Sequence, residues 1–177
     1  MNPSAAAGAA AAIHKDRLYL ALPLDGASFN NAVLEVDLTR GACLLRENLA
    51  AASFLPFDEQ LLLAGQDGLI YRMDNSRTYA GAPIQAHWIG PWRDLKAPDT
   101  VKYFESINMH AGGTLRVRLE TERGALERTM RLGTAVRPVS IRLGGHGRRF
   151  RLSFFNVDGS YFYVAPGVTL NLEDDSK

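Results

Sequence analysis

The stretch NAVLEVDLTRGACLLRE, residues 31–47, decides the fold of the first half of the chain. Residues 33, 35 and 37 are Val, Glu and Asp, and the alternate residues 34, 36 and 38 are Leu, Val and Leu. This period of two is typical of a half-buried strand. Arg40-Gly41 then has the composition of a tight turn before a second strand. The stretch therefore predicts an antiparallel β-hairpin.

The same succession of short strands and turns extends over residues 16–74. Further strands are expected at 17–22, 53–57, 59–65 and 69–74, with a hairpin turn at Gln66-Asp67-Gly68. Pro56 limits its segment to an edge strand or a strand end. Such spacing is typical of an all-β sandwich, barrel or propeller. A propeller blade takes roughly 40–50 residues, so this part amounts to little more than one blade, which cannot close a ring alone.

Longer strands are predicted in residues 83–177, at 83–90, 100–110, 114–122 and 148–159. Alternation places Leu115, Val117 and Leu119 on an inner face, with Arg116, Arg118 and Glu120 outside. In the last segment it places Phe150, Leu152 and Phe154 inside, with Arg149, Arg151 and Ser153 outside. Six or seven strands with one polar face fit a two-sheet antiparallel sandwich. The predicted fold class is therefore all-β, a partial propeller-like meander followed by an antiparallel β-sandwich.

Two segments are predicted to lie outside these modules. Within residues 1–15, residues 5–12 are alanine and glycine, and the basic residues follow this run instead of preceding it, which is not the order of a secretory signal. They are expected to form a flexible arm that orders against a neighbour, or to be an artefact of the chain start. Residues 75–82, NSRTYAGA, are predicted to be a linker too short for free movement. The two halves are therefore expected to share an interface.

Composition gives little support to catalysis. The 177 residues carry a net charge of +1, which exerts no general attraction toward nucleic acid or an anionic membrane. A lone cysteine, Cys43, excludes an internal disulfide and suits a reducing compartment. The four histidines lie at no metal-binding spacing, and phosphate-loop, dinucleotide and nucleophile-elbow motifs are missing. No enzyme activity, metal, cofactor or membrane span is predicted. For the glycine-rich segment 143–151, a hairpin loop is favoured over an anion-binding site.

Arginine is the feature that stands out. Residues 116–151 hold ten arginines, three glutamates and no lysine, a net charge of +7. Arginine is enriched at protein interfaces, where its planar group makes bidentate pairs and stacks on aromatic rings. A solvated sheet face and contact with DNA phosphates are the alternatives. The predicted interface residues are Arg116, Arg118, Arg128, Arg131, Arg142, Arg148, Arg149, Arg151, Trp88, Trp92, Tyr161 and Tyr163.

A family resemblance joins these features. Residues 30–74, from NNAVLEVDLTRG to GQDGLIYRMD, resemble the last blade of propeller-containing structural proteins of tailed-bacteriophage virions. The next segment, GAPIQAHWIGPWRDLKAPDTVKYFESINMH, continues the similarity, which covers about residues 30–110. Its matching positions are Gly81, Ile84, Asp94, Leu95, Pro98 and Lys102. Such proteins usually have a complete propeller before this point, whereas this chain has barely one blade.

The resemblance implies a non-enzymatic structural protein of the virion, in the tail or head–tail connector region. It implies a ring or trimer built from copies of itself and other virion proteins, made in the bacterial host cytoplasm. A carbohydrate- or ligand-binding β-sandwich that uses the same aromatic residues is the alternative. A DNA-contacting adaptor is the second alternative.

Overall fold

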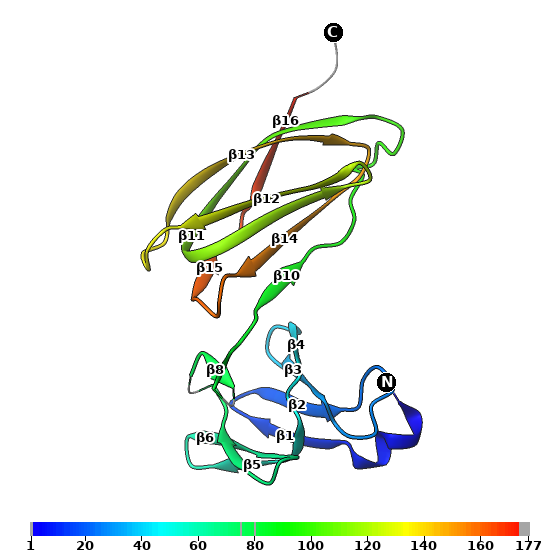
Figure 1. Cartoon of the computed structure of the whole chain (residues 1–177), viewed down its shortest axis with the longest axis vertical. Helices are drawn as coiled ribbons and strands as arrows, with labels where there is room; N and C mark the ends of the chain where they lie inside the picture. Colours follow the sequence, from blue (N-terminus) through cyan, green and yellow to red (C-terminus); the bar gives the residue numbers. More distant parts are fainter. Residues whose placement is uncertain (1, 75, 80, 174–177) are drawn as a thin grey trace. The chain divides into compact units, whose positions relative to one another are not determined.

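The computed structural model describes residues 2–74, 76–79 and 81–173, and over these residues the chain is all-β, as predicted. The chain divides into two compact units, Met1–Ser76 and Arg77–Lys177, here called unit 1 and unit 2 (Figure 1). The boundary falls within the predicted linker, of which residues 75 and 80 lie outside the described residues. The predicted interface between the halves stays a prediction.

Unit 1 contains two antiparallel sheets. The four-stranded sheet runs in sequence order through β1 (Ala10–His14), β2 (Arg17–Leu22), β3 (Ala32–Asp37) and β4 (Cys43–Glu47). The three-stranded sheet consists of β5 (Ala51–Phe57), β6 (Gln60–Gly65) and β7 (Ile70–Arg72). The predicted turns at residues 40–41 and 66–68 both join neighbouring strands. The first sheet is thus a meander, and the strands after it belong to a second sheet; the likeness to a propeller blade stays a prediction.

The inner faces of these two sheets form the core of unit 1. Tyr19 and Val33 of the four-stranded sheet are buried, as are Leu61 and Leu63 of the three-stranded sheet. The Tyr19 ring lies 6.2 Å from the ring of Phe54 on β5. Each fully buried side chain of this size stabilises the fold by about 1.5–3 kcal/mol. The opposite faces of both sheets point away from this core.

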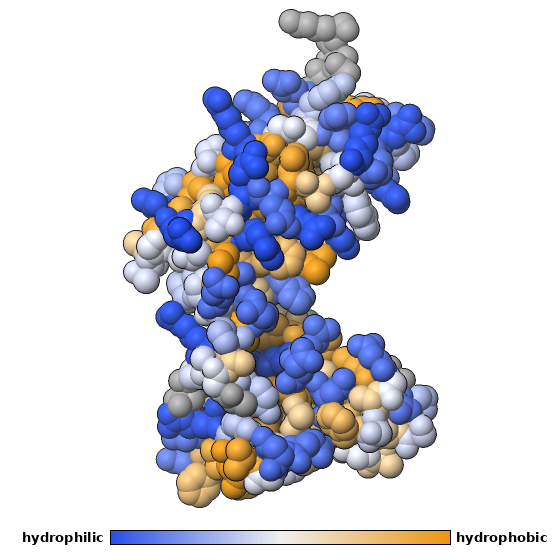
Figure 2. Space-filling model, viewed as in Figure 1, coloured by the Kyte–Doolittle hydropathy of each residue, from blue (hydrophilic) through white to orange (hydrophobic). Residues whose placement is uncertain are grey.

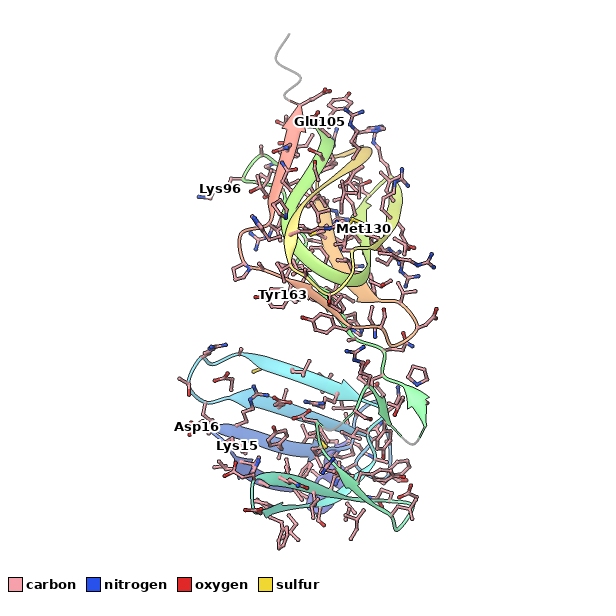
Figure 3. The ribbon with its side chains drawn as sticks, turned by 90° about the vertical axis from the view of Figure 1, so that its left-hand side faces the viewer. Lys15, Asp16, Lys96, Glu105, Met130 and Tyr163 are labelled. Carbon is pink, nitrogen blue, oxygen red and sulfur yellow. The ribbon has the colours of Figure 1, made fainter. Side chains whose placement is uncertain are left out.

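The predicted flexible arm is ordered over most of its length. Pro3–Gly8 form a short 3-10 helix, and β1 pairs along its whole length with β2. Lys15 and Asp16, both with positive φ, make the two-residue turn between these strands (Figure 3). Ladder hydrogen bonds satisfy the backbone groups of β1 that face β2, so this edge strand is held in place although its alanine side chains bury little surface. The alanine-rich composition gave no sign of this pairing.

Unit 2 is built around one long strand. β11 runs from Lys102 to Thr121 without a break, where the sequence predicted two strands. The predicted strand at 83–90 is instead two short strands separated by residues 84–86. The remaining strands of the unit are β8 (Thr78–Tyr79), β9 (Ala82–Pro83), β10 (His87–Ile89), β12 (Gly124–Arg131), β13 (Arg137–Gly147), β14 (Phe150–Asn156), β15 (Phe162–Val164) and β16 (Thr169–Glu173).

β11 changes partners halfway along. Its first half pairs with β13, β15 and β16, and its second half pairs with β12 and β14, with β10 at the edge beside β14 (Figure 1). The change occurs at Gly112-Gly113, and Gly113 has a φ of +85° that favours glycine. The two halves enclose one core, which includes Phe104, Leu115 and Phe154. Unit 2 is therefore a sandwich-like half-barrel.

Predicted inward positions are confirmed along β11 and β14. Leu115, Val117 and Leu119 are fully buried, and Phe150 and Phe154 are buried. Earlier in β11 the alternation shifts by one residue, because the register is irregular between Phe104 and Ser106. An inserted residue of this kind moves the following side chains to the opposite face. Ile107, Met109 and Ala111 thereby join the same core as Phe104.

Candidate subunit interface

The outer face of β10, β14, β11 and β12 gathers much of the arginine of unit 2. On this face Arg116, Arg118 and Glu120 follow one another along β11. Arg118 lies opposite Glu127 of β12, and Glu120 lies opposite Arg151 of β14. These five residues are here called the charged ladder. They come together because side chains two residues apart on a strand share a face and lie beside those of neighbouring strands.

Ion pairs run through the charged ladder. Glu120 accepts from Arg151 at 2.6 Å and lies 2.9 Å from an Nη atom of Arg118. Glu127 lies 3.6 Å from Arg118 and 3.8 Å from Arg116. Exposed pairs of this kind contribute about 0–1 kcal/mol each to folding. The ladder therefore places five charges, alternating in sign from one ion pair to the next, on the sheet. These charges add little to the stability of the fold.

Aromatic rings flank both ends of the ladder. The guanidinium groups of Arg149 and Arg151 lie 5.2 and 5.1 Å from the ring centre of Trp92. At the other end, Arg116 lies 5.1 Å from the ring centre of Phe155. Cation–π contacts of exposed groups contribute about 0.5–1 kcal/mol. They also hold the long arginine side chains flat against the sheet.

The long side chains cover the centre of this face. Ser153, predicted to point outward, lies on the outer face between Arg118 and Ile89 but is only 1% exposed. Its hydroxyl and the Nε of Arg118 are buried without a hydrogen-bond partner among the described residues. The prediction of direction was right and the expected exposure was wrong, since alternation sets a side chain's direction and not what lies above it.

The predicted interface residues do not all meet in one place. Arg116, Arg118, Arg149, Arg151 and Trp92 come together at the charged ladder, and the rest lie elsewhere in unit 2. Arg128 and Arg131 lie on the edge strand β12, and Arg128 is on the face opposite to the ladder because it pairs with the inward Val117. The others are Arg142 on β13, Arg148 in the β13–β14 turn, Trp88 on β10 against Phe154, Tyr161 beside Arg77 and Tyr163 on β15.

The predicted interface does not include the acidic partners of the ladder. The period of two places Glu120 outside with Arg118, but the concentration of arginine gave no role to a glutamate. Glu127 and Phe155 belong to other strands, and only the strand register brings them beside Arg118 and Arg116. The glycine-rich segment 143–151 is the end of β13, a two-residue turn and the start of β14. The predicted hairpin is wrong, because in the described chain β13 pairs with the first half of β11 and β14 with its second half, and not with each other.

The turn between β13 and β14 is held by a carboxylate. Glu122 accepts from the backbone N–H of Arg148 at 2.6 Å and of Arg149 at 3.3 Å. The hydrogen bond from Arg148 lowers the pKa of Glu122 below its ordinary value of 4.5. A lowered pKa stabilises the fold above the ordinary value, and this stabilisation disappears as the pH falls through the lower, folded-state pKa.

Glu122→Gln is expected to destabilise unit 2 by about 0.5–1 kcal/mol at pH 7, a small value because solvent screens the exposed group. Urea unfolding between pH 7 and pH 3 measures it, and the difference from wild type should shrink toward pH 3. Glu105→Gln is the matched control, since Glu105 is exposed and has no hydrogen-bond or ion-pair partner among the described residues. A difference that stays constant with pH would contradict the assigned role of the carboxylate.

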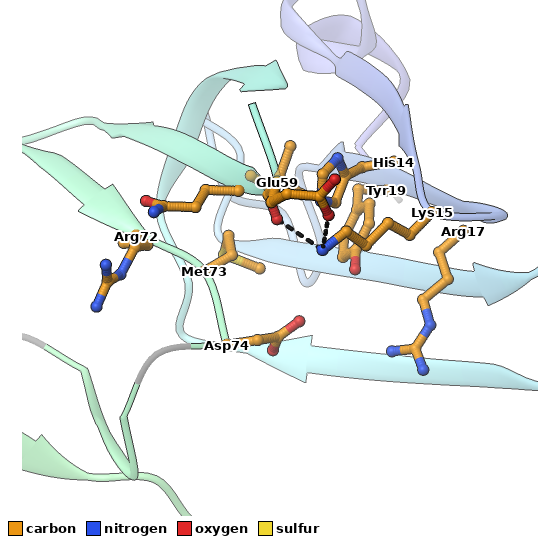
Figure 4. A pocket seen from close by; sticks show the side chains of 10 residues that line it. His14, Lys15, Arg17, Tyr19, Glu59, Arg72, Met73 and Asp74 are labelled. Atoms are coloured by element: carbon orange, nitrogen blue, oxygen red, sulfur yellow. Dashed lines mark hydrogen bonds and ion pairs between the residues drawn. The ribbon is translucent and has the colours of Figure 1, made fainter. Parts of the chain in front are cut away.

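Unit 1 has its own charged cluster beside a shallow pocket. Glu35 is buried and accepts from Arg17 at 2.5 Å and from Arg46 at 2.6 Å. The hydrogen bond and charge of Glu35 raise the pKa of Arg17, which stays positive. At the pocket itself, Lys15 reaches the carboxylate of Glu59 at 2.9 Å (Figure 4). Positive and negative groups are already paired here, so the cluster serves the packing of the two sheets.

The described part of the chain contains no candidate metal-binding cluster and no candidate membrane-spanning helix. Among residues 2–74, 76–79 and 81–173, no three potential metal-binding side chains of His, Cys, Asp or Glu lie together. The same residues include no helix with the length and apolar character needed to cross a membrane. Cys43 is exposed on β4 and lies outside the core of unit 1.

The charged ladder and the sandwich-like fold define an all-β protein with a candidate protein-binding sheet face. No protein-family model matches the chain, and no curated protein matches it significantly.

Proposed function

We propose that this protein is a non-enzymatic structural protein that assembles through its subunit interfaces, as a component of a tailed-phage virion in the tail or head–tail connector region. The charged ladder is the single observation that carries the assembly role. The virion assignment depends on the resemblance of residues 30–110 to propeller-containing virion proteins. Copies of the chain and other virion proteins are the proposed partners.

The arrangement of charges favours a protein partner. Positive and negative groups alternate along the ladder, with Glu120 between two arginines. A partner with the complementary alternation gains specificity from such a pattern, because a shifted docking position would bring like charges together.

The same arrangement disfavours the DNA-contacting alternative. Phosphate binding is strengthened by unpaired positive charge. Here Glu120 and Glu127 neutralise part of the positive charge of the three arginines beside them. The carbohydrate-binding alternative would use exposed aromatic side chains. Trp92 is 43% exposed, but two guanidinium groups already contact its ring, which leaves less of it for a sugar to stack on.

Light scattering of the full chain at low and high salt tests the proposal. We expect a multimer at low salt whose mass falls near 1 M salt, because the ladder contact is lost where the Debye length is about 3 Å. Arg116→Glu should weaken the assembly, because it places three acidic groups together at the exposed end of the ladder. Arg137→Glu, the same charge change at an exposed position of β13 outside the ladder, is the matched control.

Two results would count against the proposal. If both arginine variants change the mass equally, the ladder is not the contact surface. If Arg116→Glu leaves the mass unchanged and instead removes salt-sensitive binding to a duplex oligonucleotide, the DNA-contacting alternative takes its place. Thermal unfolding of each variant confirms that the fold is retained.

A further inference from the structure

The outer face of the four-stranded sheet in unit 1 is apolar from strand to strand. Cross-strand pairs place Ile13 beside Leu18 and Leu18 beside Val36 in one row. A second row joins Leu20, Leu34 and Leu45. These six side chains are half-buried or exposed, and Ile13 is 63% exposed. The charged residue of this face, Glu47, lies at its rim.

The three-stranded sheet also carries an apolar outer face. Leu55 of β5 pairs with Leu62 of β6, and Phe57 and Ile70 lie on the same side. The charged residue of this face, Arg72, lies beside Leu62 on the edge strand β7. Ile70 is 74% exposed, Phe57 is 64% exposed and Leu55 is 57% exposed. Hydrophobic side chains gather at the surface over β5 and β6 in Figure 2. Both sheets of unit 1 therefore have apolar residues on both faces.

The two outer faces lie on opposite sides of unit 1. The inner faces are packed together through Tyr19, Phe54 and Leu63, and side chains of the other parity must point away from that core. Strand spacing of about 4.8 Å and a rise of about 3.3 Å per residue give the four-stranded face an area on the order of 300 Å². The largest apolar patch on a typical monomer is about 300–600 Å² and is often functional, so this face is comparable with such a patch.

We propose that unit 1 associates face to back with further copies of itself. The outer face of the four-stranded sheet of one copy packs on the outer face of the three-stranded sheet of the next. This inference deepens the proposed assembly role and depends on it only for its biological setting, because the apolar faces are separate from the charged ladder.

A second copy is the occupant that the geometry favours. Each copy carries both faces, so one type of contact covers both, whereas an unrelated partner would have to occur twice. The inner faces already show that these two sheets pack together, and a contact between copies repeats that layering. The contact joins two different surfaces, so it generates a ring if the rotation closes and a filament if it does not. One contact is smaller than the roughly 800 Å² per partner of a standard interface, so the association should depend strongly on concentration.

Sedimentation equilibrium of the full chain near 1 M salt, where the ladder contact is screened, tests the inference from low to high micromolar concentration. The first variant is Ile13→Lys with Leu45→Lys on the four-stranded face, and the second is Leu55→Lys with Ile70→Lys on the three-stranded face. Each should weaken association by at least about 100-fold, because a lysine would be buried without a partner. Leu95→Lys with Val136→Lys, at exposed positions of unit 2, is the matched control and should behave as wild type.

Mixing the two face variants gives the decisive result. The first variant keeps an intact three-stranded face and the second keeps an intact four-stranded face, so an equimolar mixture should form a dimer and no larger species. A wild-type chain that stays monomeric at every concentration, or a mixture that stays monomeric while wild type assembles, overturns the inference. Salt separates it from the ladder contact, since apolar association persists near 1 M salt and ladder association does not.

Discussion

Gly113→Ala is expected to destabilise unit 2 by at least about 4 kcal/mol, the largest effect of any single substitution considered for this chain. Gly113 has a φ of +85°, in the left-handed region that costs other residues about 1–2 kcal/mol. A Cβ atom at this position would also overlap the carbonyl oxygen of Tyr161 and approach the Cα of Phe162 to 2.7 Å. Both obstacles are backbone atoms of the segment that leads into β15, so neither can turn away.

Glycine at this position also serves the partner change of β11. The N–H of Gly113 donates to the carbonyl of Gly133, and its carbonyl accepts from Leu132 at 2.8 Å. Moving the backbone to admit a methyl group would break these bonds at the point where both halves of the sandwich meet. Equilibrium urea unfolding, followed by tryptophan fluorescence of unit 2, measures the loss.

The matched control is Gly144→Ala. Gly144 has a φ of +69°, but no atom lies within 4 Å of the position of its added Cβ. It should therefore show the conformational cost alone, about 1–2 kcal/mol. Equal losses for the two variants would mean that the close approach at Gly113 relaxes without cost and that the bend does not depend on glycine.

Lys102→Met is expected to destabilise unit 2 by about 3 kcal/mol. Lys102 is 7% exposed, and its ammonium group donates to the carbonyls of Ala97, Thr100 and Arg148 at 2.5, 3.0 and 2.6 Å. Methionine fills a similar volume but leaves all three carbonyls without this donor. Hydrogen bonds from charged groups contribute about 1.5–3 kcal/mol, and unsatisfied buried acceptors add a further cost.

The effect of Lys102→Met should be concentrated in two segments. The ammonium group ties residues 97–100 to the β13–β14 turn, so amide hydrogen exchange should accelerate in both places. Lys96→Met is the matched control, because Lys96 is exposed in the same loop (Figure 3), and its stability should stay within about 0.5 kcal/mol of wild type. If the two variants have the same free energy of unfolding, the three carbonyls accept hydrogen bonds from water instead, and Lys102 does not hold the loop in place.

Strand existence followed from local patterns, and strand faces followed from them only in part. The alternation in residues 114–122 and in residues 31–38 predicted strands that the structure contains, with Leu115 inside as expected. In residues 33–38 the alternation did not identify the inner face, since Val33 and Glu35 are buried and the apolar Leu34 lies on the outer face. Such patterns are readable because the direction of a side chain on a strand depends only on its parity. The pattern failed where parity itself changed, at the irregular register after Phe104.

The candidate interface was predictable only in part. The concentration of arginine in residues 116–151 pointed to β11 and β14, and five of the twelve predicted residues meet at the charged ladder. The partners across the sheet, Glu127 and Phe155, depend on which strands lie side by side. The apolar outer faces of unit 1 depend likewise on the division of its strands between two sheets. The face of one sheet that the other sheet covers becomes the inner face, and the sequence pattern does not say which face that is.

The sequence by itself determined an all-β protein, its hairpin turns and the alternation of its strands, because each of these is set by residues within a few positions of one another. Only the tertiary structure decided that β11 passes through both halves of unit 2, that Lys102 is buried under three carbonyls and that β1 is ordered. These features depend on backbone groups far apart in the chain that meet through sheet register, and no local pattern of side chains encodes that register.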